Sequence, residues 1–140
     1  VCEAMAPVDA VSTLTGQKVV MSELQRHGPR CTMKLSSSES NQWLVNINIT
    51  EDAALIGAAF KDQKTDLERS SYSLRPLPRL GKDALLAWHS LQPAEAIFLF
   101  RIGTSTARVT LQATLNATAA PEPWIAFLAA QQMELEMRTK

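Results

Sequence analysis

The sequence predicts a single α+β domain, residues 1–140, in which an antiparallel β-sheet is flanked by helices. The chain has 140 residues, 46% of them hydrophobic, which is enough for one compact domain with one core. Segments in which apolar and polar residues alternate, as in half-buried strands, are interspersed with segments of helical spacing. Strands and helices do not follow each other in the regular alternation that a doubly wound parallel sheet requires, so we expect an antiparallel sheet.

The N-terminal half of the chain contains signals for two helices and two strands. Pro7 and Gly16 fit the first turn and the stop of a short helix. Alternation predicts one strand from Cys31 to Leu35 and another over 43–50, joined by a polar hairpin. A second helix begins at 50–52 and runs to about residue 69, with its charged residues on an exposed face. The second strand places polar side chains on one face, so we expect that face of the sheet to be wet or lightly covered.

The C-terminal half predicts three more strands and a final helix. Residues 70–78 include two prolines, which favours a loop or an edge strand. Strands are predicted over 83–89, 95–102 and 106–115, with a turn at 103–105 between the last two. Two prolines open the last helix, whose apolar residues recur at helical spacing: Trp124, Phe127, Leu128 and Leu135.

The charge balance and the apolar runs exclude two classes of protein. Fourteen basic residues balance fourteen acidic ones, which argues against a nucleic-acid partner. Apolar runs such as 84–88 and 96–100 are far shorter than the roughly 20 residues that a membrane-spanning helix needs. We therefore expect neither a nucleic-acid partner nor a transmembrane segment in this chain.

The two cysteines, Cys2 and Cys31, do not have the spacing of a zinc site. A disulfide between them would close a loop of about 30 residues and remove about 3 to 4 kcal/mol of unfolded-chain entropy. Two unrelated buried thiols, or a lipid attached to Cys2, are alternatives that the residues leave open.

No catalytic, metal-binding or cofactor-binding pattern is found in the sequence. The five glycines are too dispersed for a phosphate-binding loop, and Gly103-Thr104-Ser105 lacks the second glycine of a nucleophile elbow. The only two histidines, His27 and His89, do not form a metal-binding pair. We therefore predict no enzyme, no cofactor and no metal. An enzyme that uses the Cys31 thiolate beside His27 is the weakest of the alternatives.

Several short motifs occur in a recognisable order along the chain. Cys2 precedes a helix that stops at Gly16, Cys31-Thr32-Met33 opens a long strand, and Gly81-Lys82-Asp83-Ala84 precedes the strands and the glycine turn of the C-terminal half. This order resembles an uncharacterised family of bacterial envelope lipoproteins that are similar to PsbP in fold. Where the family usually has Cys-x-Trp and Gly-Asp-Glu-Ala, this chain has Cys-Thr-Met and Gly-Lys-Asp-Ala. The resemblance implies a PsbP-like sheet flanked by helices, a Cys2–Cys31 disulfide, a location in the periplasm or cell envelope, and no catalytic residues.

The function predicted from these observations is a non-catalytic extracytoplasmic module that binds another protein. An immunity protein that holds a secreted toxin or hydrolase inactive is the most concrete example. The partner is expected to contact two loops, 25–30 and 70–82. The predicted partner-binding residues are Arg26, His27, Arg75, Arg79, Lys82 and Trp88. The alternative is a small-ligand or lipid carrier with a pocket between the sheet and its helices, lined by Trp43, Trp88, Phe98 and Phe100.

Overall fold

The structure is a computed structural model that describes Met5 and residues 7–16, 18–27, 30–37, 43–51, 58–89, 92–103, 105–112 and 121–138. In chain order its elements are α2 (Val8–Thr15), β1 (Val19–His27), β2 (Arg30–Ser37), β3 (Trp43–Glu51), α3 (Ala58–Arg69), β4 (Ser73–Pro76), η1 (Pro78–Leu80), β5 (Leu85–His89), β6 (Gln92–Ile102), β7 (Ser105–Gln112) and α4 (Pro121–Arg138). These residues form one α+β domain, as predicted.

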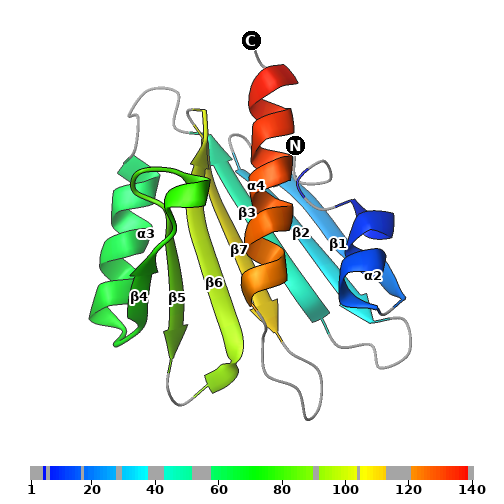
Figure 1. Ribbon diagram of the computed structural model, residues 1–140, viewed down its shortest axis with the longest axis horizontal. Helices are drawn as coiled ribbons and strands as arrows, with labels where there is room; N and C mark the ends of the chain where they lie inside the picture. Colours follow the sequence, from blue (N-terminus) through cyan, green and yellow to red (C-terminus); the bar gives the residue numbers. More distant parts are fainter. Residues whose placement is uncertain are drawn as a thin grey trace.

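The seven strands form one antiparallel sheet in the order β1-β2-β3-β7-β6-β5-β4 (Figure 1). Each strand of the first group, β1 to β3, pairs with its neighbour in sequence, and so does each strand of the second group, β4 to β7. The two groups meet where β3 pairs with β7, with Asn46 opposite Thr110 and Asn48 opposite Arg108. The polar residues of the two central strands therefore lie side by side.

One face of the sheet carries the main core. Alternate residues of the central strands point toward α4 and α2, which Figure 1 shows in front of the sheet. Three of them, Ile47, Phe98 and Val109, are fully buried. From α4, Trp124 and Leu128 pack into the same cluster, as their helical spacing predicts. The largest fully buried side chains are Phe98, Phe100, Met5, Met33, Leu35, Ile47, Ile49, Leu80, Ile97, Leu99, Leu128 and Val11, and most of them belong to this cluster.

The opposite face is covered at one end only. Phe60 and Leu67 of α3 pack on Leu85, Ile97 and Leu99 of β5 and β6, which form a second, smaller cluster. On this face the neighbouring strands β2, β3 and β7 carry polar residues, and no described helix packs on them. The prediction of a lightly covered sheet face is confirmed, and α3 is the cover at its other end.

Side-chain hydrogen bonds attach α4 to the rest of the domain. The Nε2 group of Gln132 donates to the carbonyl oxygens of Leu80 and Arg101, at 2.6 and 2.7 Å. Near the start of the helix, Arg75 of β4 lies 3.0 Å from the carboxylate of Glu122. The helix is therefore held against η1, β6 and β4 by polar contacts as well as by its apolar side.

One strand was absent from the sequence-based prediction. Residues 25–27 and 30 are not a loop, because they belong to β1 and β2, which pair along their whole length. The bulge between Met21 and Glu23 breaks the alternation that normally identifies a strand. As an edge strand, β1 also exposes apolar side chains, with Met21 41% and Leu24 39% exposed, so no single face of it is apolar.

Smaller differences concern where elements begin and end. The second helix is described from Ala58, and its predicted start at 50–52 falls partly in β3 and partly outside the described residues. Residues 70–78, predicted to be a loop or an edge strand, contain the edge strand β4, and β6 begins at Gln92, three residues earlier than expected. Residues 113–115 of the predicted last strand lie outside the described part of the chain. Of the hairpin loop predicted over 36–41, residues 36 and 37 belong to β2 and 38–41 also lie outside the described part.

Candidate binding site

A polar cavity of about 510 Å³ lies on the sheet face that α3 leaves open, beside that helix. Its lining residues come from four strands and from α3: Arg30, Thr32, Asn46, Asn48, Gln63, Glu95, Arg108 and Thr110. All eight carry polar or charged side chains, and all except the exposed Arg30 are half-buried. Polar side chains of this kind, partly withdrawn from water on a preformed surface, are suited to bind a polar ligand.

The strand register determines how these side chains are ordered. Thr32 of β2, Asn48 of β3 and Arg108 of β7 are successive partners across the sheet, and therefore form one row. Asn46 and Thr110 form the next row along the strands. Because directly paired residues of an antiparallel sheet share a face, all of these side chains point to the side of α3.

The charged residues of the cavity lie at opposite ends of this pattern. Arg30 is opposite Thr50, one row beyond the row of Arg108, so the backbone positions of the two arginines lie toward one end. Glu95 is opposite Gln112, four residues along β7 from Arg108. Four residues of an antiparallel strand span about 13 Å. The backbone positions of the two arginines and of Glu95 therefore lie toward different ends of the cavity.

One polar atom in this cavity has no partner. The side-chain Oδ1 of Asn46 is buried and accepts no hydrogen bond from the described residues. A buried acceptor without a donor costs about 1 to 3 kcal/mol, which is why such atoms are rare in folded proteins. Asn46 lines the cavity, but this oxygen is itself inaccessible to solvent, so the Asn46 side chain would have to rotate before a bound molecule could donate to it.

Glu95 is held in place by a tyrosine. The hydroxyl of Tyr72 donates to Oε1 of Glu95 at 2.7 Å. Tyr72 follows the end of α3, where the chain turns back through Ser71 at a positive φ of 66° and the Tyr72 N–H donates to the carbonyl of Leu67. The hydrogen bond to Glu95, together with burial and the negative charge of Glu95, raises the pKa of Tyr72, while the charge of Arg108 lowers it. Glu95 and Arg108 therefore both act on the same phenol.

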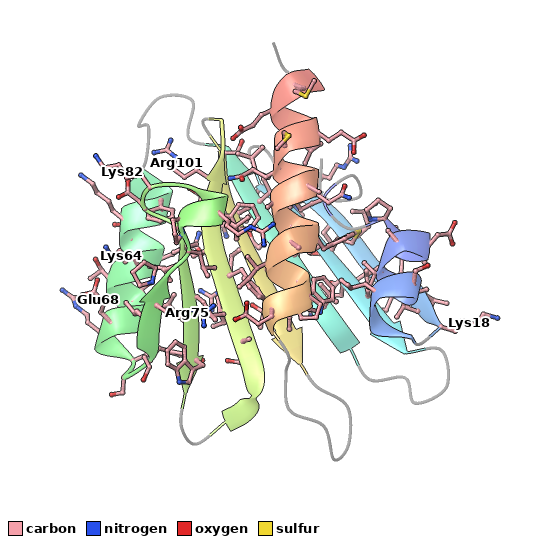
Figure 2. The ribbon with its side chains drawn as sticks, in the orientation of Figure 1. Lys18, Lys64, Glu68, Arg75, Lys82 and Arg101 are labelled. Carbon is pink, nitrogen blue, oxygen red and sulfur yellow. The ribbon has the colours of Figure 1, made fainter. Side chains whose placement is uncertain are left out.

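The partner-binding residues predicted from the sequence do not form one surface. Arg26 and His27 lie at the end of β1, and Arg75 and Trp88 lie on β4 and β5, at the opposite edge of the sheet. Figure 2 shows the same separation, with Arg75 and Lys82 on the side of β4 and Lys18, which precedes β1, at the far end.

Four of those residues belong to the stretch 75–88, which forms the β4 edge of the sheet and the turns beside it. Arg75 and Trp88 share one sheet face on neighbouring strands, since they oppose Leu86 and Ser73. Arg79 in η1 and Lys82 in the following turn are both exposed. Trp88 is 38% exposed, and Arg75 is partly occupied by its contact with Glu122.

His27 and Cys31 are not arranged as a catalytic pair. Cys31 is opposite Arg26, and His27 is opposite Arg30, so the imidazole and the sulfur lie on different faces of the sheet. Cys31 packs against the main core, and no described cysteine is a free thiol. Cys2 lies outside the described residues, so the Cys2–Cys31 disulfide stays a prediction. The side chain of His89 is also outside the described set.

The aromatic residues proposed to line a lipid pocket are placed differently. Phe98 and Phe100 are fully buried in the main core, where they pack against other side chains. Trp88 lies on the surface at β5, and the side chain of Trp43 is outside the described residues. The described cavity has no aromatic lining residue, which favours a polar ligand over a lipid.

No family model, curated protein or solved structure matches this chain, so the resemblance to the envelope lipoproteins stays a hypothesis. Within the described ranges, no group of three or more His, Cys, Asp or Glu side chains could hold a metal ion. None of the helices described is long and apolar enough to cross a bilayer.

The sequence analysis did not identify the cavity residues as a site. The alternation of Asn46 and Asn48 with apolar residues was visible, and it correctly predicted a polar face. Arg30, Glu95 and Arg108 come from three different strands, and only the strand order brings them to one place. The signal that could have marked the site is Arg108, the one charged residue on a strand face that otherwise carries Thr106, Thr110 and Gln112.

Proposed function

We propose that the protein is a non-catalytic binding module that holds a small, polar, negatively charged ligand in the cavity beside α3. The observation that carries this proposal is the lining of the cavity: two arginines, four neutral polar side chains of β2, β3 and β7, Gln63 of α3 and one carboxylate. The cavity volume of about 510 Å³ falls within the range usual for small-molecule sites, about 300 to 1,000 Å³.

Arginine is well suited to this role because its planar guanidinium group donates several hydrogen bonds to one carboxylate or phosphate. Arg108 is half-buried, so its interaction with an anion is screened less by water than that of a surface arginine. The neutral side chains Thr32, Asn48 and Thr110 add donors and acceptors around it. They would orient a ligand without reacting with it.

The test is a thermal-shift and calorimetric titration with small dicarboxylates, phosphate esters and fatty acids. We expect a polar anion to raise the melting temperature. At a hundredfold excess over its Kd, the ligand should increase the free energy of unfolding by about 2.7 kcal/mol. Arg108→Gln should abolish the effect. Arg69→Gln removes the same charge at the exposed end of α3 and is the matched control.

Two results would contradict the proposal. One is a panel in which no polar anion stabilises the protein. The other is a fatty acid that stabilises the wild type and Arg108→Gln equally, because a hydrocarbon chain gains nothing from the guanidinium group.

A second candidate function is the binding of another protein, such as a secreted toxin or hydrolase, at the β4 edge. The observation in its favour is the exposed set of Arg79, Lys82 and Trp88 in one stretch of the chain. Tryptophan and arginine are the residues that most often dominate binding energy at protein interfaces. A single stoichiometric partner that is lost by Trp88→Ala, and kept by Arg108→Gln, would support this function over the first.

The proposed location is the periplasm or cell envelope, and the proposed finer fold type is PsbP-like. The location rests on the sequence resemblance and on the expected disulfide, since disulfides persist in oxidising compartments. The fold type is compatible with an antiparallel sheet that has α4 on one face and α3 on the other. Fractionation of the source cells, followed with an antibody to the chain, tests the location, and recovery in the cytoplasm would contradict it.

A further inference from the structure

We propose that the ligand of the cavity beside α3 is a polyhydroxylated acid, such as a sugar acid, with its carboxylate at Arg108 and its hydroxyl groups against the polar side chains of the strands and α3. This inference rests on the proposed function, because it specifies which anionic ligand the same cavity takes. It follows from the hydrogen-bonding groups that the cavity offers, from its charge and from its lack of apolar lining.

Most polar side chains of the cavity are not engaged by the protein itself. Within the described residues, no hydrogen bond or ion pair involves the side chains of six of the eight lining residues: Arg30, Thr32, Asn48, Gln63, Arg108 and Thr110. Glu95 differs from them, since it accepts from Tyr72. Polar groups that the protein leaves unpaired bind water, and a ligand that displaces this water has to replace its hydrogen bonds.

The neutral side chains among these six both donate and accept hydrogen bonds. Two amides and two hydroxyls each offer an oxygen acceptor beside their donors: Asn48, Gln63, Thr32 and Thr110. A dicarboxylate or a phosphate dianion brings acceptors only, so it leaves these oxygens without a donor. A hydroxyl group donates and accepts at once. Several hydroxyl groups on one ligand therefore match this set of side chains.

The charge of the lining matches a ligand with one negative charge. Arg30 and Arg108 carry two positive charges, and the carboxylate of Glu95 carries one negative charge. A third cation, Lys34, is opposite Asn46 on β3, but its ammonium group lies 3.4 Å from the carboxylate of Glu23, which offsets its charge. A monocarboxylate therefore balances the lining, whereas a dianion is repelled more strongly by Glu95.

Arg108 is the better placed of the two arginines to bind the carboxylate. It is half-buried, whereas Arg30 is exposed, and a guanidinium group can donate two parallel hydrogen bonds to one carboxylate. Asn48 lies directly opposite Arg108. Side chains at such paired positions have their Cβ atoms about 4.5 to 5.5 Å apart. A small acid bound at Arg108 therefore has an amide next to its carboxylate.

The lining offers no apolar side chain to a hydrocarbon surface. All eight described lining residues are polar or charged. A hydrocarbon placed against such groups removes their hydrogen bonds with water and returns none. The best ligand is therefore one whose carbon atoms mostly carry hydroxyl groups, and not an aromatic or a fatty acid.

The test measures affinities by calorimetry for three sugar acids, glucuronate, galacturonate and gluconate, and for probes that differ from them in one feature. Cyclohexanecarboxylate has the ring and the carboxylate without hydroxyl groups, glucose has the hydroxyl groups without the charge, and a glucose monophosphate has a second negative charge. We expect the best sugar acid to bind about tenfold or more tightly than each of these probes. Trigalacturonate, measured beside galacturonate, distinguishes a free acid from a residue of an acidic polysaccharide as the source of the ligand.

Variants separate the contribution of the charge from that of the hydroxyl groups. Arg108→Gln should weaken the sugar acid about tenfold or more and leave glucose unchanged. Gln63→Met keeps a side chain of similar length and removes the amide, so it should weaken the sugar acid up to about tenfold and leave cyclohexanecarboxylate unchanged or improved. Gln131→Met makes the same change on α4, on the opposite face of the sheet, and is the matched control.

The results separate this inference from the proposed function. If cyclohexanecarboxylate or the glucose monophosphate binds as tightly as every sugar acid and Arg108→Gln abolishes its binding, the cavity is an anion site and the sugar-acid proposal is overturned. If glucose binds as tightly as the sugar acids and Arg108→Gln changes nothing, the charge has no role and both proposals are overturned. If none of the probes binds and the anion panel fails as well, both proposals fail together.

Discussion

The replacement of Asn46 by leucine tests whether the polar side chain at this cavity position lowers the stability of the protein. The side-chain Oδ1 of Asn46 is buried and has no donor among the described residues. Leucine has nearly the same branched shape and no polar atom, so Asn46→Leu removes the unsatisfied acceptor without leaving a void. Replacing an unsatisfied polar group with an apolar one of the same shape is neutral or stabilising.

The size of the effect follows from the burial of this residue. A fully buried unsatisfied acceptor costs about 1 to 3 kcal/mol. Because the rest of the Asn46 side chain is only half-buried, we expect the lower part of that range, about 1 to 2 kcal/mol. For a domain of this length the melting temperature should rise by about 3 to 7 °C.

The assay is urea unfolding followed by tryptophan fluorescence, with Asn48→Leu as the matched control. Asn48 lies on the same strand and face and lines the same cavity, but neither of its side-chain polar atoms is buried without a partner. We therefore expect no gain from Asn48→Leu. If Asn46→Leu is less stable than the wild type, or if both variants gain equally, the unsatisfied acceptor is not the cause and the reasoning is refuted.

Three further predictions concern the core, the tyrosine and the cysteines. Phe98→Ala should destabilise the protein by about 3 to 5 kcal/mol, because this side chain is fully buried in the main core, and a loss below about 1 kcal/mol in urea unfolding would contradict its placement. The pKa of Tyr72 is raised above its usual 10.0, so its contribution to stability is complete below pH 10 and is lost as pH rises through the raised value. Glu95→Gln should return the phenolate titration of Tyr72 toward 10.0. An unchanged titration would exclude the contact between Tyr72 and Glu95. Alkylation of the unfolded, unreduced chain should leave Cys31 unmodified, and reduction should lower stability by about 3 to 4 kcal/mol, whereas two alkylated thiols would exclude the predicted disulfide.

The fold class followed from the sequence because most strands alternate cleanly. In β3 and β7 every second residue is buried against α4, and the pattern was readable without the structure. The alternation fails in β1, where a bulge follows Met21 and the edge position exposes apolar residues on both faces. Local pattern therefore predicts strands inside a sheet better than strands at its edge.

The site was harder to predict than the fold, because it depends on which strands are neighbours. Asn46 and Asn48 lie about sixty residues from Arg108 in sequence, and they meet only because β3 pairs with β7. No hydrophobic pattern encodes that pairing, since β7 could satisfy the same alternation beside several other strands. Long-range strand order is the information that periodicity lacks.

The pairing of β3 with β7 also has a consequence for how the domain folds. All other described strand pairs are neighbours in sequence, so they close short loops and belong to two local units, one from β1 to β3 and one from β4 to β7. Contacts of low sequence separation form fast, and distant ones form after a larger loss of chain entropy. The two units should therefore assemble separately and join along this seam.

The cavity lies across the seam, with Asn46 and Asn48 on one side and Arg108 and Thr110 on the other. Neither unit alone contains a complete binding site. A ligand held there would contact both units and oppose their separation. Its binding energy would therefore stabilise the pairing of β3 with β7, which is expected to form last. If the chain were cut in the segment between β3 and α3, each of the two fragments would carry part of the cavity. A bound ligand should then strengthen the association of the two fragments.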